Sequence, residues 1–503
     1  MYSDRSQVTN CESQIMQRIF ISMWFCLISV FTGTACDAAS APQPIQNPIP
    51  EKIRKGDIVV EAVNFIRGPK TVDARQGPTK LDGIDTPLGS SNAYARLQYM
   101  LPIRDGSGRL VVSDLRGILY ITDRLGENLD VYLDLRKATS DLGNEIFPNE
   151  AGFLGFAFHP DFAKKDAPGY GKFYTGYSAR IGTGTAQYLD DDAISHYSVI
   201  REWTAENPAA NAFTGPSREI FRAGQFAQNH NIGTMSFNPY VDEDSIDYGK
   251  LYVCLGDGGS AFDPKNYGQG LSEPLGAILR IDPLGGDRNH GYGIPMDNPF
   301  FGSPDVAQEI WAYGLRHPQQ FSFDIDGRMF INDIGQNHVE EVNIGIAGAN
   351  YGWRVREGTF ATGYGVEGGY AGALFPRPAD EQPFVYPVAQ YDHDEGNAIS
   401  SGFVYRGKSI KELRGKYLFA DVVRGRVFYF TVKDIEPGHP AELRELRIKF
   451  GGKEREIIDV AGYENTYAPA TKRADLRLGI DDDGEIYLLT KGDGWIRKLM
   501  PLN

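Results

Sequence analysis

The sequence predicts an all-β fold, a six-bladed β-propeller, and three observations support this prediction. The 503-residue chain contains 58 glycines, 29 prolines, 27 tyrosines and 28 phenylalanines, a composition that suits many short strands joined by turns. No long amphipathic helical segment stands out in the sequence. A glycine-led unit with a short apolar strand also recurs along the chain.

The repeated unit is a glycine-bearing turn followed by a strand of alternating polar and apolar residues. Because a small antiparallel sheet cannot bury both of its faces alone, repeats of this size indicate a propeller, and six repeats imply six blades. A tandem of β-sandwiches with similar hairpins is the alternative. The six units are GRLVVSD (Gly108–Asp114), GKFYTGY (Gly171–Tyr177), GKLYVCLGD (Gly249–Asp257), GRMFINDIG (Gly327–Gly335), GKYLFADV (Gly415–Val422) and GEIYLLTKG (Gly484–Gly492).

Three long insertions separate these units: Ala179–Asn211, Gly285–Asp305 and Val355–Pro387. Long loops on a rigid scaffold commonly carry the functional site. We therefore expect the long loops to gather on one face of the propeller and to form the walls of a site there.

The formal net charge is 51 − 66 = −15. An acidic protein lacks the basic surface that releases counterions from a nucleic acid, so the charge argues against a nucleic-acid partner.

The N-terminus predicts export to a bacterial periplasm or envelope. Arg18 precedes thirteen almost wholly apolar residues, Ile19–Phe31, which are too few to span a bilayer but suit a signal peptide. Small residues lead from there to Cys36, which indicates a signal peptide over residues 1–36 with a lipid-anchored Cys36. Cleavage near Ala41 is the alternative.

The remaining chain is expected to hold a flexible tether, 37–55, and a propeller domain, 56–503. The tether is rich in Ala and Pro. Of the four cysteines only Cys254 falls in the domain, inside an apolar strand, so the domain has no disulfide framework and the thiol is predicted to be buried and inert.

One histidine is singled out by its surroundings. His230 lies between two asparagines in QNHNIGTMSFNP (Gln228–Pro239), directly before an apolar strand. A histidine at a loop that faces the mouth of a β-scaffold is suited to take a proton near neutral pH. A structural histidine that caps the strand is the alternative.

Ten motifs, taken in order from Val63 to Leu499, resemble the soluble quinoprotein glucose/sorbosone dehydrogenase family. The forms GQNHVEEVN and SSGFVYRG are similar to the branch that includes hedgehog-interacting-protein-like propellers. The motifs are NEAGFLGFAFHPDF (Asn149–Phe162), QNHNIGTMSFNP, KLYVCLGDGG (Lys250–Gly259), LGAILRIDP (Leu275–Pro283), YGIPMDNPF (Tyr292–Phe300), EIWAYGLRHPQQFSFD (Glu309–Asp324), INDIGQNHVEEVNIGIAGANYGW (Ile331–Trp353), SSGFVYRG (Ser400–Gly407), GKYLFADVVRGRVF (Gly415–Phe428) and LGIDDDGEIYLLT (Leu478–Thr490).

The resemblance implies a six-bladed propeller that binds pyrroloquinoline quinone and calcium at the mouth of its channel. It also implies oxidation of the anomeric hydroxyl of an aldose to a lactone. Such a reaction requires a base of near-neutral pKa, a fixed cation at the developing oxyanion and a metal that polarises the cofactor.

Site residues follow from the resemblance, motif by motif. His230 matches the base and Arg316 the arginine that stabilises the oxyanion. The expected cofactor-binding residues are Glu150, His317, Arg406, Arg424 and its neighbour Arg426, and the expected calcium turn is Gly335 and Gln336, which would offer backbone carbonyls.

Several of these residues depart from the family pattern. His317 stands where an Asn is common, Gln336 replaces a Pro, and Arg406 replaces a Lys. Thr234 stands where the glucose enzyme has an Arg near the base.

The chemistry is consistent with this assignment, because planar guanidinium groups bind carboxylates in bidentate fashion and the quinone carries three carboxylates. We expect Arg316, Arg406 and Arg424 to converge at one mouth. Each arginine has a structural alternative, such as an ion pair of Arg316 with Glu309 or Asp324.

Three functions stay open at this point. The first is an exported quinone-dependent sugar dehydrogenase. The second is a non-catalytic propeller that binds a glycan or a protein partner, since a fold alone does not determine function. The third is a metal-dependent hydrolase, which is disfavoured because no cluster of three His or carboxylate ligands has suitable spacing.

Overall fold

The structure is a computed structural model, and it describes residues 43–71, 79–81, 84–86, 94–143, 150–189, 193–286, 291–379, 383–433, 435–464 and 472–502. The predicted signal peptide, 1–36, and the lipidation site Cys36 lie outside these residues. Across the described ranges, no helix combines the length and apolar character needed to cross a membrane.

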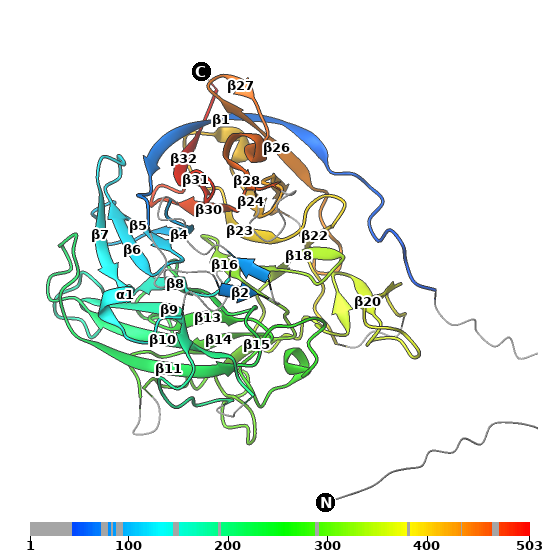
Figure 1. Ribbon diagram of the computed structural model, residues 1–503, viewed down its shortest axis with the longest axis horizontal. Helices are drawn as coiled ribbons and strands as arrows, with labels where there is room; N and C mark the ends of the chain where they lie inside the picture. The colour runs from blue at the N-terminus through cyan, green and yellow to red at the C-terminus, as the bar shows by residue number, and fades with distance from the viewer. Residues whose placement is uncertain are drawn as a thin grey trace, which may run out of the picture. The chain divides into compact units, whose positions relative to one another are not determined.

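Six strands in the described part of the chain form a closed inner ring (Figure 1). Each contacts the next, and the last pairs in parallel with the first through Gly479 and Met100. This ring confirms the predicted six-bladed propeller. The inner strands are β4 (Leu97–Pro102), β8 (Phe153–Phe158), β12 (Ile232–Phe237), β16 (Gln320–Phe323), β23 (Ile399–Val404) and β30 (Leu476–Ile480).

The six repeated sequence units coincide with the second strand of each blade. Every unit begins with a glycine at a backbone φ between +71° and +83°, the left-handed region that other residues rarely adopt. The glycines are therefore needed for the turn that leads from the inner strand to the second strand. The second strands are β5 (Leu110–Asp114), β9 (Lys172–Arg180), β13 (Leu251–Leu255), β17 (Met329–Asp333), β24 (Lys416–Asp421) and β31 (Ile486–Thr490).

The outer strands complete each antiparallel blade, as in blade three, where Ile232 pairs with Leu255 and Leu255 with Ala277. They are β6 (Ile118–Thr122), β7 (Leu129–Asp134), β10 (His196–Thr204), β11 (Ser217–Gln225), β14 (Ala277–Ile281), β15 (Ile310–Tyr313), β18 (Val339–Ile344), β22 (Ala389–Asp392), β25 (Val427–Thr431), β26 (Arg444–Phe450) and β32 (Trp495–Met500). The predicted insertion Ala179–Asn211 therefore contains the end of β9 and the whole of strand β10.

The smaller elements lie in connections between strands. The insertion Val355–Pro387 contains a three-stranded sheet of β19, β20 and β21. These elements are β2 (Thr79–Leu81), β3 (Ile84–Thr86), α1 (Leu135–Ala138), η1 (Tyr267–Gln269), β19 (Arg356–Glu357), β20 (Phe360–Thr362), β21 (Leu374–Phe375), η2 (Lys411–Leu413), β27 (Lys453–Glu454), α2 (Ile457–Ala461), β28 (Tyr463–Glu464) and β29 (Lys472–Arg473).

The N-terminal strand β1 (Arg54–Arg67) closes the ring. It pairs antiparallel with β32, where Ala62 lies opposite Leu499, and in parallel with β26, where Val60 lies opposite Ile448. The described part of the predicted tether also contacts the domain, because the backbone N–H of Ile45 donates to the carbonyl of Leu374 at 2.7 Å.

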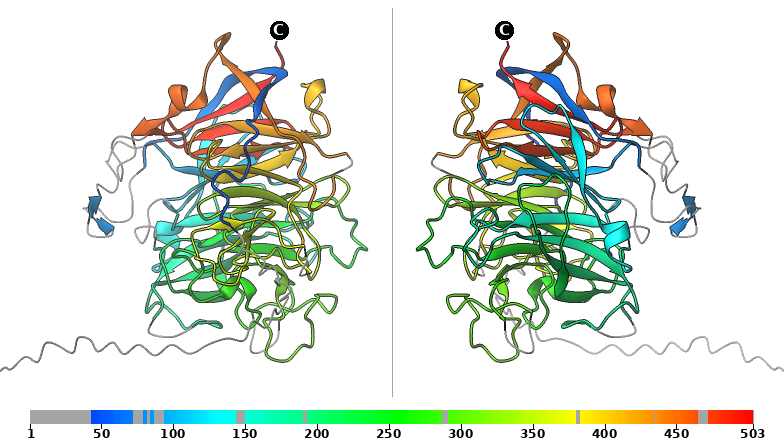
Figure 2. Two further views of the ribbon diagram at one scale, coloured as in Figure 1. Left: turned by 90° about the vertical axis from the view of Figure 1, so that its right-hand side faces the viewer. Right: turned by 90° about the vertical axis from the view of Figure 1, so that its left-hand side faces the viewer.

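The inner strands all run in one direction, so they define two ends of the propeller. The end at which they begin, next to His230, is called the His230 end; the end at which they finish is called the far end. The insertion 285–305 leaves β14 at Ile281, which pairs with Leu251 at the far end. The long connections therefore occupy both ends rather than one (Figure 2).

Apolar residues fill the spaces between blades. Phe330 of β17 stacks on Tyr417 of β24 with ring centroids 4.6 Å apart, for example. A buried aromatic of this size stabilises the fold by about 2–3 kcal/mol relative to an exposed one. Cys254 is fully buried, as expected, and burial raises the pKa of its thiol.

Candidate functional site

His230 lies at the start of β12, facing the channel, and adopts a left-handed backbone conformation with φ of +55°. Such a conformation is uncommon outside glycine and occurs where the surroundings impose it. The side chain is 3% exposed, and burial, with a smaller contribution from the Arg316 cation, holds the pKa of His230 well below its ordinary value of 6.5. The imidazole is therefore neutral at pH 7 and able to accept a proton.

Asp257 holds His230 in place. Its Oδ1 lies 2.6 Å from His230 Nδ1, and its Oδ2 accepts a 2.8 Å hydrogen bond from Trp353 Nε1. Burial raises the pKa of Asp257 to about 6, so the carboxylate is mostly ionised at neutral pH. An ionised Asp257 accepts a hydrogen bond from the protonated Nδ1 of His230. The unprotonated Nε2 is then the basic atom of the ring.

Glu150 lies against the base from blade two. Its Oε2 accepts a 3.3 Å hydrogen bond from the backbone N–H of His230. Burial raises the pKa of Glu150, and the nearby cations Arg316, Arg473 and Arg477 act in the opposite direction. Glu150, which the sequence predicts to be a cofactor-binding residue, therefore lies beside His230.

Arg316 lies at the same end as His230, before β16. Its backbone N–H donates to Asp333 Oδ2 at 2.9 Å, and its guanidinium donates from Nη1 to the carbonyl of Ile334 at 3.0 Å and from Nε to Gln336 Oε1 at 3.2 Å. The guanidinium carbon also lies 5.7 Å from the centre of the Trp353 ring. Trp353 thus contacts both the arginine and the carboxylate that holds the base.

His317 stacks on His230, with ring centroids 4.9 Å apart and planes inclined by 29°. Its backbone N–H donates to Asp333 Oδ1 at 2.7 Å. Asp333 therefore binds both residues of the Arg316–His317 turn through its two oxygens. Burial lowers the pKa of His317 well below its ordinary value, with smaller contributions from His230 and the nearby arginines.

The expected calcium turn is a tight loop between β17 and β18. A Cβ at Gly335 would lie 1.8 Å from the carbonyl oxygen of Val339, so only glycine fits there. Four consecutive backbone N–H groups, from Gln336 to Val339, donate to Glu357 Oε1 at 2.8–3.1 Å. Because the amide groups bind this carboxylate, carbonyl oxygens are the ligands that the turn offers to a cation.

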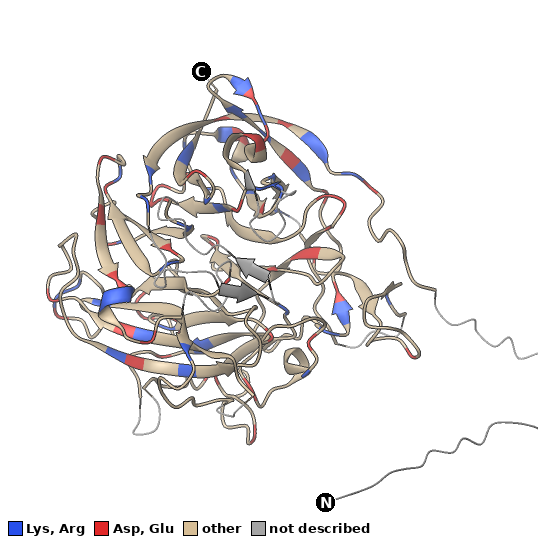
Figure 3. Cartoon of the chain, viewed as in Figure 1, with Lys and Arg blue, Asp and Glu red and all other residues tan. Residues whose placement is uncertain are grey.

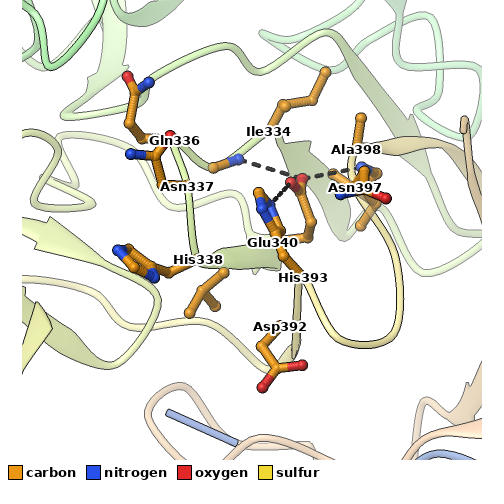
Figure 4. Close-up of polar contacts among 12 residues, drawn as sticks. Ile334, Gln336, Asn337, His338, Glu340, Asp392, His393, Asn397 and Ala398 are labelled. Atoms are coloured by element: carbon orange, nitrogen blue, oxygen red, sulfur yellow. Dashed lines mark hydrogen bonds and ion pairs between the residues drawn. The ribbon is translucent and has the colours of Figure 1, made fainter. Parts of the chain in front are cut away.

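Glu340 connects this turn to blade five (Figure 4). The carboxylate accepts hydrogen bonds from the backbone N–H groups of Gly335 at 3.2 Å and Ile399 at 2.9 Å, and it lies 2.9 Å from His393 Nε2. Glu340 is fully buried. It therefore fixes the calcium turn against the start of an inner strand.

Arg424 and Arg426 follow β24 at the His230 end. The Arg424 guanidinium donates to the carbonyls of His393 at 2.8 Å and Asp394 at 2.5 Å. Arg426 forms ion pairs with Glu395 at 2.5 Å and Glu445 at 2.6 Å. Both side chains thus bind the neighbouring connection, and Arg426 is bound by two carboxylates.

Arg406 was predicted to bind the cofactor near His230, but it lies at the far end of the propeller. It follows inner strand β23 and forms a bidentate ion pair with Asp324, at 2.8 and 2.6 Å. Asp324 directly follows β16, whereas Arg316 precedes that strand. The length of β16 thus separates Arg406 from the site, and the expected convergence of Arg316, Arg406 and Arg424 does not occur.

Other basic residues lie at the His230 end, where Arg406 was expected. Lys491 at the end of β31 is 6% exposed, and burial lowers its pKa well below the ordinary value; Arg477, Arg96 and Arg473 lower it further. Arg477 donates from Nη2 to Gln319 Oε1 at 3.1 Å, next to the Arg316–His317 turn. Charges of both signs mix along the blades (Figure 3), and Arg473 is paired with Asp475 at 2.6 Å.

The residues present fit a flat polyanion. Arginines from blades four and six, a buried lysine and a neutral imidazole face one another at the His230 end, and guanidinium groups of this kind bind carboxylates. Within the described residues no group of three His, Cys, Asp or Glu side chains is placed to hold a metal. The backbone carbonyls of Gly335 and Gln336 are the oxygens of this turn that would suit a calcium ion.

The described strands form a closed six-bladed propeller with a His–Asp pair and an arginine at one end of its inner ring. The profile of the Glucose / Sorbosone dehydrogenase family matches residues 100–466. The chain therefore belongs to the glucose/sorbosone dehydrogenase family, as the motifs predict.

Relatives by sequence include plant and bacterial proteins. The chain is 30% identical over 452 residues to the HIPL1 protein of Arabidopsis thaliana, covering 80% of this chain and 61% of that protein. It is 25% identical over 356 residues to quinoprotein glucose dehydrogenase B of Acinetobacter calcoaceticus, covering 66% and 65%. The chain thus spans about three-fifths of the length of these relatives.

Solved structures share the fold. The apo form of the soluble aldose sugar dehydrogenase of Escherichia coli superposes with a TM-score of 0.55 at 20% identity, covering 81% of this chain and 97% of that chain. The PQQ-bound aldose sugar dehydrogenase of Streptomyces coelicolor gives 0.51 at 19% identity, covering 86% and 99%.

Proposed function

We propose that this protein is a quinone-dependent sugar dehydrogenase that uses pyrroloquinoline quinone and calcium to oxidise the anomeric hydroxyl of an aldose to a lactone. The observation that carries the proposal is the arrangement of His230, Asp257 and Arg316 at one end of the channel. A base oriented by a buried carboxylate, next to a fixed cation, is the arrangement that alcohol oxidation requires.

The chain's own residues supply proton transfer and charge stabilisation. His230 Nε2 accepts the proton of the sugar hydroxyl, and Asp257, hydrogen-bonded to Nδ1, stabilises the imidazolium that forms. The Arg316 guanidinium stabilises the negative charge that the sugar oxygen gains as its proton moves to His230. Pyrroloquinoline quinone, when bound, supplies the acceptor for that hydride.

Glu150, Arg473, Arg477 and Lys491 are the residues we assign to cofactor binding, with Arg316. Burial raises the pKa of Glu150, and its Oε2 accepts the backbone N–H of His230, which places the carboxyl beside the base. The basic side chains of Arg473, Arg477 and Lys491 are suited to bind the carboxylates of the quinone. Arg424 reaches the same end but binds backbone carbonyls, so its part in cofactor binding is an additional proposal.

A non-catalytic propeller that binds a glycan or a protein partner is the second candidate. The chain is 27% identical over 323 residues to the Hedgehog-interacting protein of Mus musculus. The Gln336 side chain also binds Arg316, at 3.2 Å, and accepts from the backbone N–H of Phe262, at 2.9 Å. Because the Gln336 side chain holds the Arg316 guanidinium, this contact favours a structural role for Arg316.

Reconstitution separates the two candidates. The purified protein, loaded with pyrroloquinoline quinone and calcium, should show sugar-dependent reduction of the cofactor spectrum and reduction of an artificial dye. His230→Ala should abolish turnover while cofactor binding stays within about twofold. The exposed His439 provides the matched control, and His439→Ala should leave both unchanged. A broad sugar panel without any spectral change favours the binding module.

We also propose that the protein is exported to a bacterial envelope and anchored by a lipid on Cys36. The apolar segment Ile19–Phe31 and the small residues before Cys36 support this proposal. Cells that express the full chain should incorporate radiolabelled palmitate into it and retain it in the membrane fraction. Cys36→Ser should remove the label; an unlabelled wild-type protein refutes the lipid anchor.

A further inference from the structure

The far end of the channel contains a cavity of about 400 Å³ that has no part in the proposed reaction. It is lined by the C-terminal ends of the inner strands, including Phe237 of β12 and Ile480 of β30, and by the connections that follow them. His230 precedes β12, so at about 3.3 Å per residue roughly 20 Å of strand separates it from Phe237. A molecule in this cavity therefore cannot react at His230.

The walls of this cavity, called the far-end cavity, are mainly aromatic. The rings come from four different inner strands, and most of them are buried against the blades. They include Tyr99 on β4, Phe156 on β8, Phe321 on β16 and Phe403 on β23, each 1–5% exposed. Cavities of a few hundred Å³ with several aromatic rings in their walls are typical of sites for small ligands.

Several polar residues also line the cavity, among them Lys164, Ser236, Asp242 and Glu243. Ser322 lines it too, but its hydroxyl oxygen is buried and lies near Tyr417. Arg104 is exposed at the rim, where its guanidinium carbon lies 5.3 Å from the centre of the Tyr240 ring. Arg104 forms no ion pair with any described residue, whereas the neighbouring Lys164 is bound by Glu243 at 2.5 Å.

The surface beside the mouth is also apolar. Ile246, in the connection that forms one side of the cavity, is 65% exposed, and Ile325, two residues beyond the lining residue Phe323, is 54% exposed. Single exposed aliphatic side chains are ordinary on a protein surface, so the aromatic rings supply the apolar character of the cavity. The cavity and its mouth thus match a ligand with an apolar body and one anionic group.

We propose that the far-end cavity binds an amphiphile whose alkyl chain enters between the aromatic walls and whose acidic head pairs with Arg104. The acidic rim residues Asp242 and Glu243 disfavour heads with more than one negative charge. The ligand has two possible sources, a free fatty acid and the acyl chain of an anionic membrane lipid.

Dodecanoate, kept below its critical micelle concentration, is the probe, and isothermal titration calorimetry is the measurement. Wild-type protein should bind one equivalent. Ser236→Phe, which places a ring in the cavity, should weaken binding more than tenfold, and Arg104→Gln should weaken it roughly fivefold. Arg124→Gln is the matched control, since Arg124 is exposed at the same end and paired with Asp483 at 3.0 Å; it should not change binding.

Co-sedimentation with vesicles of phosphatidylcholine and phosphatidylglycerol distinguishes the two sources. Dodecanoate binding without vesicle retention identifies a free amphiphile, and retention that Ser236→Phe abolishes identifies a membrane lipid; both results support the proposal. No dodecanoate binding by the wild type, or equal binding by a folded Ser236→Phe and by Arg104→Gln, overturns it. The thermal unfolding midpoint verifies that each variant is folded, and Arg104→Gln changes only an exposed side chain.

Discussion

Asp257 Oδ1 lies 2.6 Å from His230 Nδ1, and this contact joins the end of β13 to the start of β12. We predict that Asp257→Asn lowers kcat/KM of the reconstituted enzyme by about 10²–10⁴-fold, because the amide favours the wrong imidazole tautomer and cannot stabilise an imidazolium. Dye-coupled kinetics measure the effect.

Asp263→Asn is the matched control for this substitution. Asp263 is also buried, its pKa is also raised to about 6, and it accepts hydrogen bonds from the backbone N–H groups of Tyr267 and Gly268 rather than from His230. Equal losses in the two variants would indicate a structural effect of removing a buried carboxylate and would contradict the assigned role of Asp257.

The acid limb of the pH–rate profile should lie at about pH 6 or below, because Asp257, whose pKa is raised to about 6, must be ionised to orient His230. Burial and the Arg316 cation lower the pKa of His230, so the imidazole stays neutral, and active as a base, to lower pH than a solvated histidine. Rates of the reconstituted enzyme measured between pH 4 and 8 test this sign. A limb near or above 6.5 is incompatible with His230 as the base in this environment.

The calcium turn depends on Glu357, whose Oε1 accepts four backbone N–H groups. Glu357→Gln replaces a charged acceptor with a weaker neutral one, so we expect calcium affinity of the cofactor-loaded protein to fall about 10–100-fold. Calcium titration of the cofactor spectrum measures this change. Glu412→Gln, a change in the exposed turn η2, should have no effect; equal affinities in both variants place calcium elsewhere.

Arg406→Ala should leave cofactor affinity unchanged and reduce the stability of the fold. Removal of the guanidinium leaves Asp324, which is 1% exposed, without its bidentate partner, at a cost of about 2–4 kcal/mol. Arg477→Ala should instead weaken cofactor binding. Denaturant unfolding and cofactor titration of both variants test the distinction, and weaker cofactor binding by Arg406→Ala would contradict the placement of this residue at the far end.

The propeller could be predicted because its signal is local and periodic. Each blade requires a left-handed glycine in the turn before its second strand, and that requirement leaves the same pattern in the sequence at Gly108, Gly249 and Gly415, for example. Arg406 was placed wrongly because motif order does not encode strand direction. His230 and Arg316 precede their inner strands, whereas Arg406 follows one. Because all inner strands run in the same direction, Arg406 lies at the opposite end of the propeller.

Other site residues were missed because they become neighbours only in the folded ring. Asp257 could have been found, since it ends the GKLYVCLGD strand that pairs with the strand after His230. Trp353 and Arg477 give no such signal. They reach the mouth from an insertion and from the last blade, and their distance from His230 in the sequence hides the contact.

The last prediction concerns ring closure by β1. A chain that begins at Gly68 lacks the strand that pairs with both β32 and β26, and it exposes the edges of two blades at once. Unpaired edges are templates for aggregation, and a propeller with an unfinished last blade loses the contacts that hold its ends together. We therefore expect this truncation to be insoluble or to unfold at a much lower temperature than the full domain. A chain that begins at Gln43 retains β1 together with the Ile45 contact to Leu374, so it serves as the control and should match the full-length protein in thermal unfolding and size-exclusion chromatography. The result that would contradict this prediction is a chain beginning at Gly68 that stays monomeric with an unchanged unfolding midpoint. In that case β1 is a peripheral strand, and the pairing of β30 with β4 closes the ring without it.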